Sequence, residues 1–281
     1  MTCGRPTTRR WGRRWCAAVI LTLVTAVAGH AGRSIIPIPE IIVDPNEGTT
    51  IGLLPVVLFT NEQDEIRYML APDFSYNKTR GFFPRFRLFS YPTPTRRWSV
   101  VAGKSTTKDE RYLGSFTDRG LWDGRAYVIA DVMHERDSTE RFYGFGNSSH
   151  QSGESNYTNN DTVAQVNPGV WLLPHLALGH NMRIRRHSLD SGQVSSLPFI
   201  ETAHPETRGR GDQPAVYWSH RLALAYDSRD DLDIPGHGAF ATAYTEAADQ
   251  TLGSATSFVK FGVEWRDFIP LEYRALKGVL A

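Results

Sequence analysis

Long runs in which apolar and polar residues alternate strictly constrain this chain more than any other feature of its sequence. Side chains point alternately to the two faces of a β-strand. In one such run, one face therefore holds Leu222, Leu224 and Tyr226, and the other holds Arg221, Asp227 and two alanines. One face suits lipid and the other suits water, which is typical of a strand in an outer-membrane barrel.

The same alternation recurs along the chain in segments that are often about ten residues long. A tilted transmembrane strand needs about 9–11 residues, whereas a strand of a soluble protein has about 5–6. Aromatic residues gather near the segment ends, as in the girdles of membrane barrels. The sequence therefore predicts an all-β fold, an antiparallel transmembrane β-barrel. The expected strands cover residues 48–59, 66–77, 84–91, 96–105, 111–116, 125–134, 162–173, 176–185, 215–226, 238–244 and 259–266.

The N-terminus has the pattern of a secretory signal peptide over residues 1–31. Four arginines between residues 9 and 14 precede an apolar run at 16–28, which is too short to span a bilayer as a helix. Its removal would also remove both cysteines, Cys3 and Cys16. We expect a short periplasmic approach segment at 32–47 and a partial barrel domain at 48–281.

Charge and residue spacing exclude several classes of function. Without the signal peptide and its arginines, the formal net charge of +1 becomes about −4, which argues against nucleic-acid binding. The histidines are scattered, with no cysteine partner after the signal peptide and no His-Glu-x-x-His spacing. We therefore expect no catalytic site, no metal site and no cofactor.

Two motifs stand in order along the chain. The first is Arg-Phe-Tyr-Gly-Phe-Gly-Asn-Ser-Ser at 141–149, and the second is Leu-Ala-Tyr-Asp-Ser-Arg-Asp-Asp at 224–231, with a proline and a glycine downstream. With these motifs, most of the chain after residue 48 resembles the bacterial surface antigen family, the barrel part of the outer-membrane assembly factors BamA and TamA. The resemblance implies a single-chain barrel, sixteen-stranded in the family, that inserts or translocates proteins. Its partners would be outer-membrane lipid and client outer-membrane or secreted proteins.

The matching positions are expected to be architectural. Gly144 and Gly146 permit positive φ or close backbone approach at the start of a strand. Asp227 and Arg229 either pair inside the barrel lumen or belong to a solvated charged turn. The positions that match the family motifs, with Ser228 in place of threonine, are Phe142, Gly144, Phe145, Gly146, Asn147, Tyr226, Asp227, Arg229, Asp230, Pro235 and Gly238.

The sequence departs from the family pattern in three ways. The stretch before residue 48 has no room for periplasmic peptide-binding domains, and no Arg-Gly-aromatic motif follows the last expected strand. About ten or eleven strands are expected, whereas a bacterial barrel closes with an even number. The chain is therefore expected to be a truncated family member, or else a smaller barrel of ten or so strands.

Three hypotheses about function follow. The first is an integral barrel of the bacterial outer membrane that acts in protein insertion or translocation. The second is a passive pore, since Arg183, Arg185 and Lys260 fall on the lumen face and would attract anions. The third is a secreted soluble β-sandwich that binds a ligand, which the modest hydropathy favours.

Overall fold

The fold is a single antiparallel sheet that contains nearly every regular element of the chain. The computed structural model describes residues 32–147, 149–208, 214–232, 234–273 and 276–280. The expected signal peptide at 1–31 lies outside these residues. Within them the sheet has fourteen strands. The strands are β1 (Arg33–Asp44), β2 (Gly48–Thr60), β3 (Ile66–Leu70), β4 (Asp73–Asn77), β5 (Gly81–Thr93), β6 (Arg96–Lys104), β7 (Glu110–Leu121), β8 (Ala126–Phe142), β9 (Ser155–Leu173), β10 (Leu176–Ser191), β11 (Ala215–Asp227), β12 (Gly238–Ala248), β13 (Phe258–Tyr273) and β14 (Leu276–Leu280).

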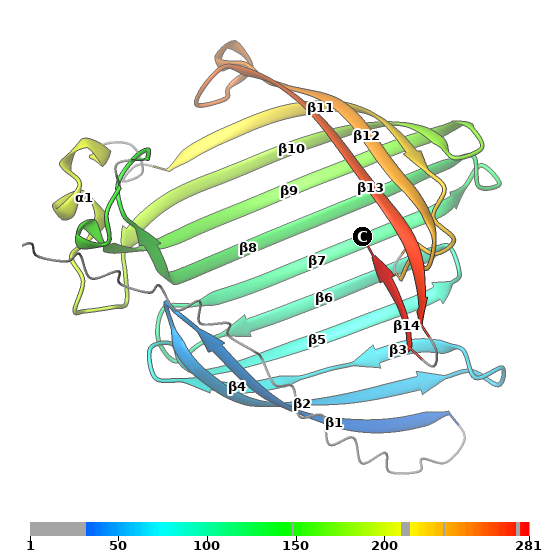
Figure 1. Cartoon of the computed structure of the whole chain (residues 1–281), viewed down its shortest axis with the longest axis horizontal. Helices are drawn as coiled ribbons and strands as arrows, with labels where there is room; N and C mark the ends of the chain where they lie inside the picture. The colour runs from blue at the N-terminus through cyan, green and yellow to red at the C-terminus, as the bar shows by residue number, and fades with distance from the viewer. Residues whose placement is uncertain (1–31, 148, 209–213, 233, 274–275, 281) are drawn as a thin grey trace, which may run out of the picture.

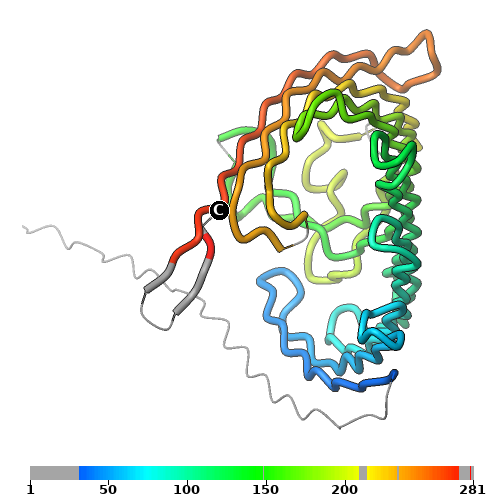
Figure 2. The backbone as a smooth tube through the Cα atoms, turned by 90° about the vertical axis from the view of Figure 1, so that its right-hand side faces the viewer, coloured from blue at the N-terminus to red at the C-terminus, as the bar shows by residue number. Residues whose placement is uncertain are grey.

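The strands pair in chain order, so the sheet is a continuous meander from β1 to β14 (Figure 1). Figure 2 shows the sheet curling into an incomplete, C-shaped ring, with the blue N-terminal and the orange to red C-terminal strands toward its open side. Among the described residues, no backbone pairing joins β1 to β14. This one curled sheet confirms the all-β antiparallel prediction. It does not have the two packed sheets of a β-sandwich.

The expected strand at 66–77 is split into β3 and β4, which occupy one position in the sheet. Both pair with β2 and with β5. The break falls at Ala71 and Pro72, where the proline has no backbone N–H to donate. The alternation continues across the break, so Phe74 and Tyr76 remain on the same face as Tyr68.

The expected count of ten or eleven strands is too low. All eleven expected segments are strands, but the sheet also contains β1 and β14. The approach segment expected at 32–47 is mostly β1, paired with β2 from Arg33 opposite Phe59 to Asp44 opposite Gly48. The sequence of this segment shows no period-two alternation because both faces are apolar, and Pro37 and Pro39 argue further against a strand. An edge strand tolerates such prolines, since its outer N–H groups need no ladder partner.

The two faces of the sheet differ sharply in burial. On β4, Asp73 is fully buried on the concave, lumen face, whereas Phe74 on the opposite face is 46 % exposed. On β13, Phe261 and Val263 are 78 % and 84 % exposed. A convex apolar surface combined with a concave polar surface is the pattern expected of a membrane barrel. No helix in the described part of the chain has the length and apolar character needed to cross a membrane.

On the lumen face, a tyrosine ring packs directly over a glycine of the neighbouring strand. The ring of Tyr244 on β12 occupies the place where a Cβ on Gly262 of β13 would lie. The guanidinium of Arg221 lies 4.3 Å from the centroid of the same ring. A larger residue at position 262 would displace this ring, so the glycine is required by close packing across the strand pair.

The two ends of the sheet differ in their connections. At one end, called the short-turn end, residues 94–95 and 174–175 form the tightest turns. At the other, called the long-loop end, the longest connections are 143–154 and 192–214. These loops contain the short helices η1 (Gln151–Gly153), α1 (Ile200–Ala203) and η2 (Pro205–Thr207), and η3 (Gln250–Leu252) follows β12. Figure 1 shows α1 beyond this end of the strands.

Candidate functional site

The first motif lies at the long-loop end, directly after β8. Phe142 is the last residue of that strand, so the motif follows a strand and does not begin one, contrary to the expected position of the two glycines at the start of a strand. Gly144 and Gly146 have φ values of +108° and +77°, a conformation that glycine adopts without strain. The Phe142 ring packs edge-on against Phe145, with ring centroids 5.0 Å apart. Asn147 is exposed in the loop that follows.

The first motif is joined to the long loop between β10 and β11. The ring of His204 also packs edge-on against Phe142, at 4.9 Å between centroids, and its Nε2 lies 2.7 Å from the Gly153 carbonyl. The fully buried Asn156 donates to the Glu140 carbonyl and accepts from the Val194 N–H, at 2.8 Å each. The two loops therefore form one packed unit beyond the strand ends.

Further contacts draw distant strand ends together at the long-loop end. Thr139 at the end of β8 donates to Glu47 in the turn between β1 and β2, at 2.9 Å. Arg80, in the turn between β4 and β5, bonds Asp137 on β8 at 2.8 Å. Lys108 donates to the Ser191 carbonyl on β10, also at 2.9 Å. Each of these bonds joins a turn to a strand that is not its neighbour in the sheet, so together they tie distant parts of the sheet to one another at this end.

The second motif lies at the opposite, short-turn end. Asp227 is the last residue of β11, and Arg229 binds both of its carboxylate oxygens, at 2.7 and 2.8 Å. The predicted pair therefore forms, but Arg229 belongs to the turn that follows the strand. Tyr226 points to the convex face, where it is 41 % exposed.

The rest of the second motif holds the turn between β11 and β12 in one conformation. Asp230 accepts from the backbone N–H groups of His237 and Gly236, at 3.0 and 2.8 Å, and these bonds lower the pKa of its carboxyl group. Gly238 has a φ of +106°, and a Cβ there would collide with the backbone of Ser228. Pro235 lies half-buried in the same turn. The two family motifs are thus at opposite ends of the sheet and form no common site.

The lumen face carries two clusters of charged side chains that were not predicted as sites from the sequence. The first, called the Asp73 cluster, contains Glu40 on β1, Asp73 on β4, and Arg85 and Arg87 on β5. Asp73 contacts both arginines, with Arg87 at 2.8 Å. The only sequence signal for Asp73, Arg85 and Arg87 is that they fall on the lumen side of the alternation, and Glu40 has no such signal because β1 does not alternate.

The second, called the Glu246 cluster, lies on the lumen face of β9 to β13. Glu246 accepts from Arg221 at 2.6 Å and from Ser219 at 3.0 Å, and Arg185 donates to Asp161 at 2.7 Å. Arg183 and Lys260 line the same cavity, whose volume is about 380 Å³. Arg183, Arg185 and Lys260 were predicted from the alternation to lie on the lumen face, and these three side chains all line the cavity.

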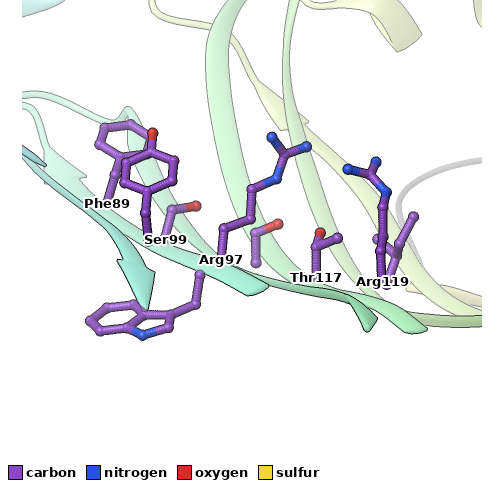
Figure 3. Close-up of a pocket in the computed structure, with 9 residues that line it drawn as sticks. Phe89, Arg97, Ser99, Thr117 and Arg119 are labelled. Carbon is purple, nitrogen blue, oxygen red and sulfur yellow. The ribbon is translucent and has the colours of Figure 1, made fainter. Parts of the chain in front are cut away.

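A second lumen cavity, of about 400 Å³, lies nearer the short-turn end. Figure 3 shows Arg97 and Arg119 projecting to the same side of the sheet as Ser99 and Thr117, with Phe89 beside them. The guanidinium groups come from neighbouring strands, β6 and β7, and the hydroxyl groups line the same cavity. This wall is polar and cationic, like the Glu246 cluster.

The described residues contain no group of three or more His, Cys, Asp or Glu side chains that could hold a metal ion. Neighbouring serine and histidine residues do not combine into a hydrolytic site. Ser219 bonds Glu246 on the lumen face, whereas His220 points to the convex face and bonds Trp218 at 2.7 Å. Adjacent residues of a strand face opposite sides of the sheet, which keeps these two groups apart.

Comparison with known proteins gives one result. Residues 96–279, from β6 to β14, match the model of the Omp85 superfamily domain. The match includes both motifs and the Glu246 cluster. No curated protein matches the chain.

Proposed function

The chain belongs to the Omp85 superfamily of outer-membrane proteins, and on that premise we propose that it acts in the insertion or translocation of other proteins at the bacterial outer membrane. The observation that carries the proposal is the family match over residues 96–279, which includes both motif segments. Its partners are outer-membrane lipid along the convex face and an unfolded client protein. The proposal assigns no catalytic residue and no cofactor, because binding and guidance of a polypeptide require no bond chemistry.

The two ends of the sheet suggest an orientation in the membrane. Outer-membrane barrels have short turns on the periplasmic side and longer loops outside. The short-turn end would therefore face the periplasm, together with the start of β1 at Arg33. The second motif would face the periplasm, where clients arrive, and the first motif would lie outside.

The packed long-loop end favours this role over that of a permanently open pore. The bonds from Thr139 to Glu47 and from Lys108 to Ser191 cross between strand ends that are distant in the sheet. A channel for free diffusion needs a lumen that is open at both ends, whereas a barrel that handles proteins needs to open only when a client is present. Burial raises the pKa of Glu47, an effect that Arg80 opposes. The long-loop end therefore contains a partly desolvated carboxyl group.

A passive pore is the second candidate, and the cationic lumen wall is the observation in its favour. Arg183, Arg185 and Lys260 line one cavity and would raise the local concentration of anions. Single-channel recording in planar bilayers tests this candidate directly. Steady, anion-selective conductance without a client would favour the pore.

The proposed function is tested by client folding in lipid vesicles. The purified chain is reconstituted, its folded state is checked by heat-modifiable gel mobility, and an unfolded model outer-membrane barrel is added. We expect faster folding of the client than in vesicles that contain an unrelated folded barrel at equal density. An equal folding rate in the two preparations would overturn the proposal, and absence of the folded chain from the membrane fraction would overturn its premise.

A further inference from the structure

The Glu246 cluster surrounds a lumen cavity with more positive than negative charge. The cavity has a volume of about 380 Å³ and is lined by side chains of β10 to β13 and the adjoining loop. Its cations come from three different strands, so they approach one space from several sides. Its charged lining residues are Arg183, Arg185, Arg221, Lys260 and Glu246.

Two of the four cations are neutralised within the protein. Arg185 bonds Asp161 at 2.7 Å, and Arg221 bonds Glu246 at 2.6 Å. Among the described residues, Arg183 and Lys260 have no acidic side chain within 4.0 Å. The cavity therefore has an excess of about two positive charges.

The base of the cavity is well shielded from water. Ser219 and Glu246 are only 6 % and 5 % exposed. Tyr217 and Phe258 add aromatic rings to the lining. Charges at this base interact more strongly than on an open surface, because the effective dielectric constant is lower, whereas the Lys260 side chain is exposed to solvent.

We propose that this cavity is a binding site for phosphate groups, in which Arg183 and Lys260 hold the anion. A phosphate monoester carries about −1.5 to −2 charges at pH 7, which matches the excess of two cations. The planar guanidinium of Arg183 suits two parallel hydrogen bonds to phosphate oxygens, and the Lys260 ammonium adds a point charge. The volume exceeds that of one phosphate group, so it also accommodates a diphosphate.

The position of the cavity determines how the ligand enters. Arg185 and Phe258 lie toward the long-loop end of their strands, and Thr256 belongs to the loop between β12 and β13. The ligand enters from that end, either as a free phosphate compound or as the phosphate of a lipid headgroup. The site does not depend on the proposed function, because no client contact is used to define it.

The test is calorimetric titration of the folded chain with inorganic pyrophosphate in zwitterionic detergent at low salt. We expect saturable binding to the wild type and about tenfold weaker binding for both Arg183→Gln and Lys260→Gln, since one charge-assisted hydrogen bond contributes about that factor. Arg266→Gln is the matched control. It removes one cation from the same face of β13, but Arg266 contacts Glu264 and lies away from the cavity. Its affinity should stay within twofold of wild type.

Heat-modifiable mobility confirms that each variant is folded. Absence of binding by the wild type, or unchanged binding by both cavity variants, would overturn the site. An equal loss in Arg266→Gln would also overturn it, because it would indicate diffuse attraction of the anion by the whole lumen.

A competition experiment separates the two ligand sources. If vesicles that contain phosphatidic acid weaken pyrophosphate binding and phosphatidylcholine vesicles do not, the lipid phosphate occupies the site, whereas equal binding in both assigns it to a free phosphate compound.

Discussion

The two clusters on the lumen face differ in how their acidic and basic side chains are balanced. The Asp73 cluster has two acids and two bases, and its central carboxylate is fully buried. The Glu246 cluster, with Asp161 included, has four bases and two acids around a cavity. The balanced cluster ties strands together, whereas the unbalanced one leaves charge available to a ligand.

The strand arrangement explains the compactness of the Asp73 cluster. Glu40 on β1 lies opposite Gly52 on β2, and Gly52 lies opposite Ser75 on β4. The missing side chain at position 52 leaves room for the Glu40 carboxylate, which would lie 3.1 Å from an added Cβ. The cluster therefore connects β1 with β4 and β5 across β2.

The largest effect is expected from Asp73→Asn, which breaks the balanced cluster. Arg85 and Arg87 would then lose the buried carboxylate that contacts both, and Glu40 would be the one acid left in the cluster. Removing one partner of a buried pair costs about 3–5 kcal/mol. The free energy of unfolding, measured by urea titration in lipid vesicles, should fall by about 3 kcal/mol. Ser75→Ala on the same strand is the control, since it loses one hydrogen bond, to the Phe83 carbonyl, worth about 1 kcal/mol. Equal losses in the two variants would contradict a special role for the cluster.

A smaller loss of stability is expected from Glu246→Gln in the unbalanced cluster. Glutamine can still accept from Ser219, so only the charge on Arg221 loses its partner, at a cost of about 1–2 kcal/mol. The same variant should bind pyrophosphate several times more tightly, because the cavity gains net positive charge. Urea titration and calorimetry together check both effects, and weaker pyrophosphate binding would show that Glu246 serves mainly to position Arg221.

Gly52→Ala tests whether the small residue between β1 and β4 matters. Its Cβ would lie 3.1 Å from the Phe74 carbonyl, a backbone atom that cannot move freely. We expect a loss of about 1 kcal/mol in the free energy of unfolding from this overpacking. Gly114→Ala on β7 is the matched control, since no atom lies within 4 Å of its added Cβ. If both variants behave alike, close packing at position 52 is not important.

The smallest effect on stability is expected from Lys260→Gln, which removes an excess cation rather than one of a pair. Its free energy of unfolding should stay within about 0.5 kcal/mol of wild type. Any change should be a gain at low salt that disappears at high salt, because like-charge repulsion is screened. Urea titrations at two salt concentrations measure this difference. A loss comparable to that of Asp73→Asn would erase the distinction between the two clusters.

Alternation predicted most of the sheet, because the lumen and membrane faces impose opposite demands on neighbouring residues. All eleven expected segments, from 48–59 to 259–266, are strands. The exceptions are instructive. β1 has apolar residues on both faces and two prolines, so period-two alternation gives no signal there, and pairing with β2 decides its conformation. Pro72 splits one strand in two although the alternation continues through it.

The motif residues were identified from the sequence, but their surroundings were not. The sequence placed Gly144, Gly146, Asp227 and Arg229 in family motifs. It could not show that His204, some sixty residues later, packs against Phe142, because that contact joins two loops across the end of the sheet.

By itself, the sequence determined the fold class, the polar and apolar faces and the family, because these depend on local periodicity and on short motifs. Only the tertiary structure decided which charges meet. Glu40 and Asp73, or Arg183 and Lys260, are brought together by strand register and by the curl of the sheet. Register depends on the pairing of whole strands, so no single segment could reveal that one lumen wall is neutral and the other cationic.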